Sequence, residues 1–93
     1  MTKALRAKLD QERLPADGRD LARSHDRVLV VRGVDLLDVA VALATDDTAS
    51  VALWLTDGRL IRPEKEDLAT GAFEVVIVQP FVVARELPPA ATA

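Results

Sequence analysis

The sequence FEVVIVQPFVVAR, residues 73–85, decides the fold. Its apolar residues are mostly valine and phenylalanine, the β-branched and aromatic types that favour strands. Pro80 has no backbone N–H and interrupts a ladder, so the stretch predicts two strands, Phe73 to Val78 and Phe81 to Arg85. We therefore expect a β-sheet built around this strand pair.

Two shorter strands are predicted ahead of this pair. Val28 to Val31 has four apolar residues in a row, without the polar alternation of a half-exposed strand. A strand of that kind is buried on both faces of its sheet. Arg59 to Arg62 contains Leu60 and Ile61 and follows a glycine, which predicts a further short strand.

Helical spacing of apolar residues marks the stretch between these strands. Asp35 to Ala44 begins with a residue type that caps helix N-termini, and its apolar residues then follow the i, i+3, i+4, i+7 spacing of a buried stripe. A second helix is predicted from Thr48 to Thr56, after a tight acidic turn, with Gly58 just beyond its end. Together they form a helix-turn-helix-like pair at 35–56.

Two further helices are predicted at 3–13 and 64–70, and a short one at 17–25. The chain is thus predicted to be an α+β fold, with a small mixed sheet of three to four strands and about four helices. Residues 1–86 are expected to form a single domain, with an N-terminal helical arm at 1–26 and a core at 27–86. Residues 87–93 are expected to be a flexible tail.

Several short motifs occur together in a fixed order along residues 30–86. They are VDLLDVA at 34–40, ATDD at 44–47, Val51, Trp54, Gly58 and VVIVQPFVV at 75–83. Their order and spacing resemble a family of small bacterial proteins known as domain of unknown function 2288. This resemblance implies the boundaries of the folded core. The family has no established activity, so the resemblance implies no mechanism.

Charge is divided unevenly along the chain. Residues 1–32 contain eight basic and five acidic side chains, a net of +3, whereas residues 33–93 contain four basic and ten acidic, a net of −6. One interpretation is that the two parts attract each other within one fold. The other is a basic arm that docks on an acidic partner or on nucleic acid. The basic residues of that arm are Lys3, Arg6, Lys8, Arg13, Arg19, Arg23 and Arg27.

No sequence pattern points to catalysis, a metal or a cofactor. The chain has no cysteine, and its four isolated glycines form no phosphate-binding loop. The only histidine, His25, lacks a motif that would pair it with the adjacent Ser24. Asp46 or Asp47 is interpreted as the cap of the helix at 48–56, and the spacing of a calcium loop is absent. We therefore expect a protein that is not an enzyme, without catalytic residues, metal or cofactor.

No stretch of the sequence matches a segment that directs a protein to a membrane. The first ten residues are charged and contain no apolar stretch of the signal-peptide type. No apolar run approaches the roughly 20 residues that a membrane-spanning helix needs. The sequence thus predicts a cytoplasmic protein that has no membrane partner.

The function that the sequence favours is a non-enzymatic protein-interaction module that self-associates. The closing strand pair contains more valine than a chain of 93 residues readily covers, and an exposed strand edge can pair with a second copy. The residues predicted for this contact are Phe73, Val75, Ile77, Phe81 and Val83. Another protein is the other expected partner.

The alternative is a nucleic-acid-binding regulator that uses the helix pair as a winged helix-turn-helix-like element. Arg59 and Arg62 would then contact the nucleic acid. The helix at 48–56 has no Lys, Arg, Asn or Gln, and three acidic residues flank it: Asp46, Asp47 and Asp57. Since nucleic-acid binding depends on neutralising phosphates, this alternative is disfavoured.

Overall fold

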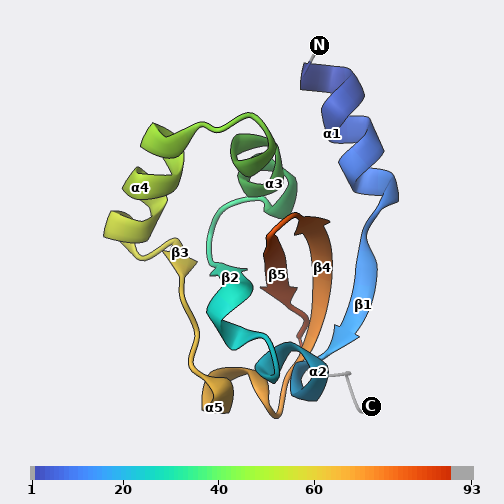
Figure 1. Cartoon of the computed structure of the whole chain (residues 1–93), viewed down its shortest axis with the longest axis vertical. Coiled ribbons are helices and arrows are strands. Elements are labelled where there is room, and N and C mark those ends of the chain that lie inside the picture. The colour runs from blue at the N-terminus through green and yellow to red at the C-terminus, as the bar shows by residue number, and fades with distance from the viewer. Residues whose placement is uncertain (1, 89–93) are drawn as a thin grey trace.

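The computed structural model describes residues 2–88 and places the closing strand pair inside a five-stranded sheet. The strand order is β1-β4-β5-β2-β3, and Figure 1 shows how the helices surround it. The strands are β1 (Leu14–Asp17), β2 (Val28–Val31), β3 (Leu60–Ile61), β4 (Ala72–Val78) and β5 (Phe81–Glu86). The helices are α1 (Thr2–Gln11), α2 (Gly18–Ala22), α3 (Leu36–Ala44), α4 (Thr48–Asp57), α5 (Lys65–Leu68) and the short 3-10 helix η1 (His25–Arg27).

The sheet is mixed, as the sequence predicts. β4 and β5 form an antiparallel hairpin around Gln79 and Pro80, with Val78 opposite Phe81. β5 runs parallel to β2, and the edge strands β1 and β3 are antiparallel to their neighbours. The predicted strand pair at 73–85 is therefore confirmed.

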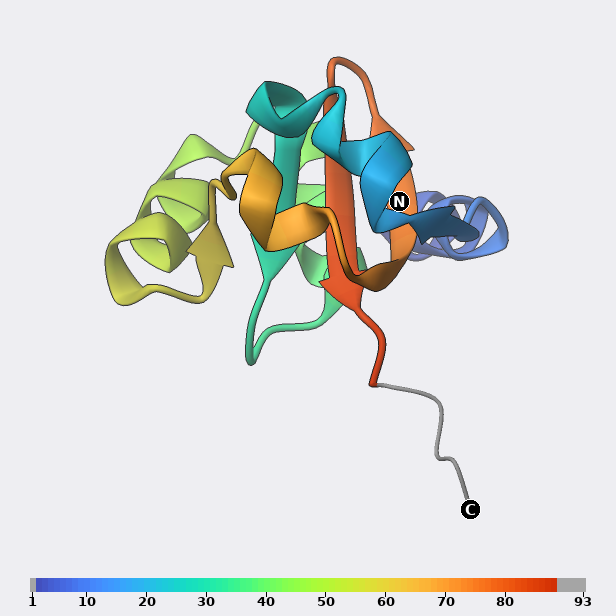
Figure 2. The same cartoon turned by 90° about the horizontal axis from the view of Figure 1, so that it is seen from below.

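The central strands carry apolar side chains on both faces, and helices cover both. β2 is buried at all four positions. Leu29 and Val31 belong to a core shared with α1 and α3, whereas Val28 and Val30 belong to a smaller core covered by α2 and α5. Figure 2 shows this layering, with α3 behind the sheet and α2 and α5 in front of it.

The prediction of three to four strands is wrong, because the sheet has a fifth strand, β1. The pattern around Pro15 predicts only the end of a helix, since proline cannot donate to a ladder. β1 nevertheless pairs with β4, with Leu14 opposite Val75 and Asp17 opposite Ala72. It lies at the edge of the sheet, the position at which a strand tolerates proline.

Acidic side chains fix the starts of the two predicted core helices. Asp35 accepts a hydrogen bond from the Leu37 N–H at 2.8 Å, and Asp47 accepts one from the Ser50 N–H at 3.2 Å. Gly58 ends α4 in the left-handed conformation, with φ 76°, which only glycine adopts without steric cost. The helix pair predicted at 35–56 is thus confirmed as α3 and α4.

The N-terminal arm packs against the core. Leu9 of α1 is buried in the core beneath α3, and Leu5 packs beside it. Arg6 pairs with Asp38 in the first turn of α3 and with the capping residue Asp35, at 3.3 Å from the latter. These contacts agree with the interpretation in which the basic N-terminal third attracts the acidic remainder.

The predicted flexible tail at 87–93 lies mostly outside the described residues. Its first residue, Leu87, donates a backbone hydrogen bond to the Ala72 carbonyl at 2.9 Å. The pairing of β4 with β5 therefore continues one residue beyond the predicted domain boundary at residue 86.

A second ion cluster joins the arm to the sheet at Glu74. Arg13 Nη1 lies 2.9 Å from Glu74 Oε1, and Arg85 Nη2 lies 3.0 Å from the same oxygen. Partial burial raises the pKa of Glu74, but the hydrogen bonds and charges of Arg85 and Arg13 outweigh burial and hold that pKa below its ordinary value of 4.5. The ionised form of Glu74 is therefore the form that stabilises the fold.

We expect Glu74→Gln to lower the free energy of unfolding by about 1–2 kcal/mol at neutral pH, because it removes a charged acceptor from two arginines. Since the pKa of Glu74 is lower in the folded state, its contribution is complete above the unfolded pKa and is lost as pH falls through the folded one. Urea unfolding at several pH values measures the deficit of the variant, which should shrink toward acid.

The matched control is Glu66→Gln, at an exposed carboxylate on α5, which should change stability by less than about 0.5 kcal/mol. A deficit of Glu74→Gln that is equal at neutral and acidic pH would contradict the stabilising role of the ionised carboxylate.

Candidate functional site

α4 is an apolar helix that the fold leaves largely uncovered. Its sequence, TASVALWLTD, contains six apolar residues, yet none of its ten residues is buried. By contrast, α3 buries five of its nine residues. Leu53 is 58% exposed, whereas Val51, Trp54 and Leu55 are half-buried against the core. α4 therefore lacks the single buried apolar stripe of an ordinary surface helix.

A groove of about 340 Å³ lies between α3 and α4. Both helices contribute to its walls, and Phe81, the half-buried first residue of β5, is exposed to it. Its apolar lining residues are Ala42, Leu43, Val51, Ala52, Leu55 and Phe81. Because protein interiors are close-packed, an unfilled apolar space of this size offers contacts that the chain itself does not make.

The charged residues that line the groove are both acidic, Asp46 and Asp47. Asp46 has φ 56° in the turn between the helices. The Asp47 carboxylate accepts hydrogen bonds from the hydroxyl of Ser50 at 2.7 Å and from its N–H, and these two bonds lower the pKa of Asp47. The groove therefore combines an apolar lining with a negative rim at the helix turn.

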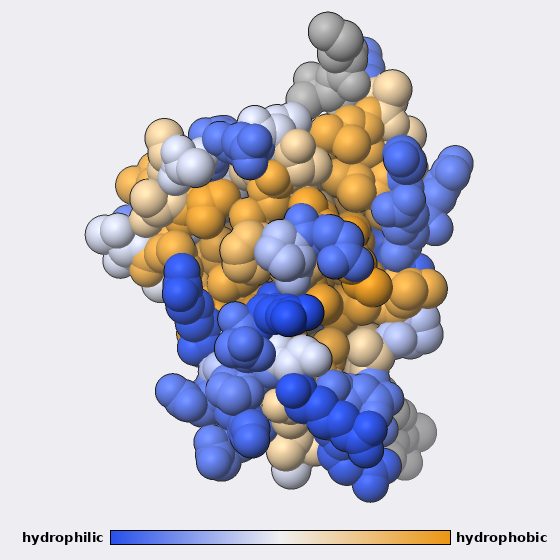
Figure 3. Space-filling view, in the orientation of Figure 1, coloured by the Kyte–Doolittle hydropathy of each residue, from blue (hydrophilic) through white to orange (hydrophobic). Residues whose placement is uncertain are grey.

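Hydrophobic residues also gather on the outer surface near this groove. Figure 3 shows them over α4 and across the middle of the same face. A second group, the sheet patch, consists of the exposed Leu14 and Ile77 and the half-buried Val82. Leu14 lies opposite Val75 and Ile77 lies opposite Val82, so the three side chains share one face of the sheet. Leu14 and Ile77 are 50% and 45% exposed.

The five residues predicted for self-association lie in different surroundings. Phe73, Val75 and Val83 are buried, with at most 4% of their surface exposed, whereas Ile77 is exposed and Phe81 lines the groove. The expectation of a free edge at the closing strand pair is wrong, because β4 lies between β1 and β5, and β5 lies between β4 and β2. Ile77 and Phe81 are the two that a partner can reach.

The residues predicted for nucleic-acid contact flank an edge strand of the central sheet. Arg59 and Arg62 are exposed on either side of β3, and β3 is an edge strand of the central sheet, paired with β2. In the basic arm, Arg6, Arg13 and Arg19 pair with carboxylates of the same chain. This pairing reduces the positive charge that the arm can offer to phosphates.

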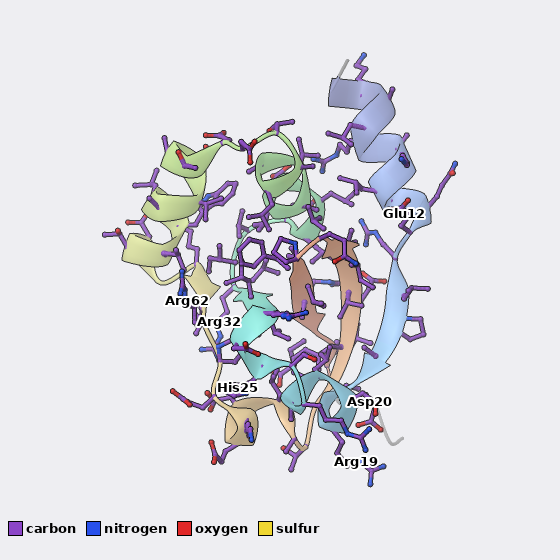
Figure 4. The ribbon with its side chains drawn as sticks, in the orientation of Figure 1. Glu12, Arg19, Asp20, His25, Arg32 and Arg62 are labelled. Atoms are coloured by element: carbon purple, nitrogen blue, oxygen red, sulfur yellow. The ribbon has the colours of Figure 1, made fainter. Side chains whose placement is uncertain are left out.

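Among residues 2–88, no group of three or more His, Cys, Asp or Glu side chains is placed to hold a metal ion. His25 begins η1 and is half-buried there (Figure 4). No helix of the same residues is long and apolar enough to span a membrane.

These features define a class of α+β domain in which a five-stranded mixed sheet lies between helices on both faces. The chain belongs to the family described as protein of unknown function (DUF2288), whose model matches residues 4–86. The resemblance predicted over 30–86 is thus confirmed and extends through the arm. The NMR solution structure of PA1075 from Pseudomonas aeruginosa is similar, with a TM-score of 0.73, 33% identity, and coverage of 97% of this chain and 91% of that one. No curated protein matches the chain.

Among the apolar residues that line the groove, only Phe81 is predicted from the sequence as a contact residue. The helical pattern predicts that Val51 and Leu55 face inward, and they do pack against the core. The signal that could have revealed the groove is the helix at 48–56 itself. Its apolar residues surround the helix instead of forming one stripe, so a single neighbouring layer cannot cover them all.

We expect Ala52→Leu to leave the free energy of unfolding unchanged or to raise it by up to about 1 kcal/mol, because the larger side chain fills open apolar space in the groove. Ala49→Leu is the matched control, since it makes the same change at an exposed position of α4 that does not line the groove. Urea denaturation should show a smaller gain for it. A loss of more than about 1 kcal/mol for Ala52→Leu would show that the space is already filled.

Proposed function

We propose that the protein is a non-enzymatic protein-interaction module of the cytoplasm that binds its partner in the groove between α3 and α4. The observation that carries the proposal is that α4, a helix with six apolar residues, fully buries none of them. Apolar surface removed from water stabilises a complex by roughly 25 cal/mol per Å² before the costs of association. A partner that covers this helix therefore gains binding free energy by burying apolar surface that the fold leaves exposed.

The lining of the groove indicates the chemistry of the partner. Its apolar walls suit aliphatic side chains, and the carboxylates of Asp46 and Asp47 attract a cation at one end. Complementary charge of this kind orients a partner and speeds its association. The partner segment is therefore an amphipathic helix that carries Lys or Arg beside its apolar stripe, docked in the manner of a helix in a groove.

The test is a titration of the isotope-labelled protein with a synthetic amphipathic peptide that has leucine on one face and lysine on the other. We expect amide shifts concentrated at Leu43, Ala52 and Leu55. Asp46→Asn should weaken binding at least about threefold, because it removes one rim charge. Asparagine tolerates the left-handed conformation of that position.

Asp57→Asn is the matched control, since it removes an exposed carboxylate at the other end of α4, outside the groove. It should leave the affinity unchanged, and a peptide with glutamate in place of lysine should bind more weakly. Shifts spread over all faces of the protein, or an equal loss with Asp57→Asn, would contradict the proposal.

Self-association through the sheet patch is a second candidate, supported by the exposure of Leu14 and Ile77. These two residues and Glu12 line a shallow hollow of about 320 Å³. A two-fold pair of molecules would cover the same patch on both copies. Pairing through the face of the sheet is favoured over pairing through the edge of β1, because Pro15 within that strand blunts the edge.

Sedimentation velocity at micromolar concentration tests this second candidate. We expect the natural protein to sediment in part as a dimer, and Ile77→Lys to shift it to monomer because a charge then lies in the contact. The free energies of unfolding of the natural protein and of Ile77→Lys should agree within about 0.5 kcal/mol. The matched control is Leu53→Lys, at an exposed apolar residue of α4 outside the sheet patch, which should leave the dimer intact. A strictly monomeric natural protein would end this candidate.

A further inference from the structure

A second cavity lies on the other face of the sheet, where β2 and β5 end. Its volume is about 210 Å³. Four apolar residues form its walls: Val30, Ile61, Pro63 and Phe73. Three charged residues complete the lining: Arg32, Asp67 and Glu86. A small cavity that combines apolar walls with a few convergent charged groups has the general form of a site for a small ligand.

The parallel pairing of β2 with β5 brings the opposite charges of this cavity together. Val30 lies beside Ala84, and two residues further along each strand come Arg32 and Glu86. Side chains two residues apart point to the same face, and neighbouring strands are about 4.8 Å apart. Even so, within residues 2–88 no ion pair joins Arg32 to Glu86. Both charged side chains therefore line the cavity without a direct ion pair between them.

The charged groups are held from elements that the fold fixes. The Arg32 N–H donates to the Arg59 carbonyl at 2.7 Å, which anchors the end of β2 against the chain leading to β3. Asp67 Oδ2 accepts from the Glu64 N–H at 2.9 Å at the start of α5. This hydrogen bond fixes one carboxylate oxygen of Asp67. The orientation of the Asp67 carboxylate is therefore set before any ligand binds.

We propose that this cavity binds a free α-amino acid with an aliphatic side chain. Arg32 matches the carboxylate of such a ligand, Glu86 and Asp67 match its ammonium group, and the apolar walls accept its side chain. An anion alone would meet the two carboxylates, and a cation alone would meet the guanidinium, so a zwitterion is the species that satisfies both signs. The volume is that of about seven water molecules at roughly 30 Å³ each, which suits a single amino acid.

The test is a titration of the isotope-labelled protein with L-leucine, followed by amide and methyl shifts. We expect saturable shifts at Val30, Ile61 and Phe73, with a dissociation constant on the order of 1 mM. N-acetyl-leucine lacks the ammonium group and leucine amide lacks the carboxylate. Each should bind at least about tenfold more weakly, because it leaves one charged side of the cavity without a partner.

Arg32→Gln should weaken leucine binding at least about tenfold. The matched control is Arg62→Gln, at another exposed arginine on the β2–β3 side of the molecule (Figure 4) that does not line the cavity. Both variants should unfold at the natural midpoint, so a loss of binding would not reflect a loss of fold.

Three results would overturn the proposal. They are an absence of saturable shifts with leucine up to about 20 mM, equal binding of N-acetyl-leucine, and undiminished binding by Arg32→Gln.

Discussion

Apolar side chains alternate between the two faces of the paired strands β2 and β5, and each face of the sheet then needs a cover. β2 is the clearest case, since all four of its side chains are buried and alternate between the two cores. α1 and α3 cover one face, and α2 and α5 cover the other except at the sheet patch. The N-terminal arm is therefore a structural part of the domain, held by Leu9 in the core and by the shared carboxylate of Glu74.

The same requirement explains why α4 remains exposed. α3 already covers the middle of its face of the sheet, so α4 packs beside it, against α3 and the short edge strand β3. A helix in that position touches the core along one side only, through Val51, Trp54 and Leu55. Its other apolar residues have no layer above them, and the gap between the two helices becomes the groove.

Local signals predicted much of the fold. β2, the hairpin at 73–85 and the α3–α4 pair each follow from a few neighbouring residues, such as Asp35 and Asp47 as caps and Gly58 as a stop. β1 could not be predicted in this way, because four residues with an internal proline gain their strand character from pairing with β4. Strand order is equally non-local, which is why residues buried at the sheet centre, such as Val75 and Val83, could be mistaken for an exposed edge.

Amide hydrogen exchange on the monomeric protein measures most directly whether α4 is the uncovered element of the domain. Exchange by local opening is slow where a helix is covered by a packed core and fast where it is not. Amides at 51–55 in α4 should exchange at least about tenfold faster than those at 39–43 in α3, while β2 and β5 should be slowest. Equal protection of α3 and α4 would contradict the account, because it would mean that α4 is as well covered as α3.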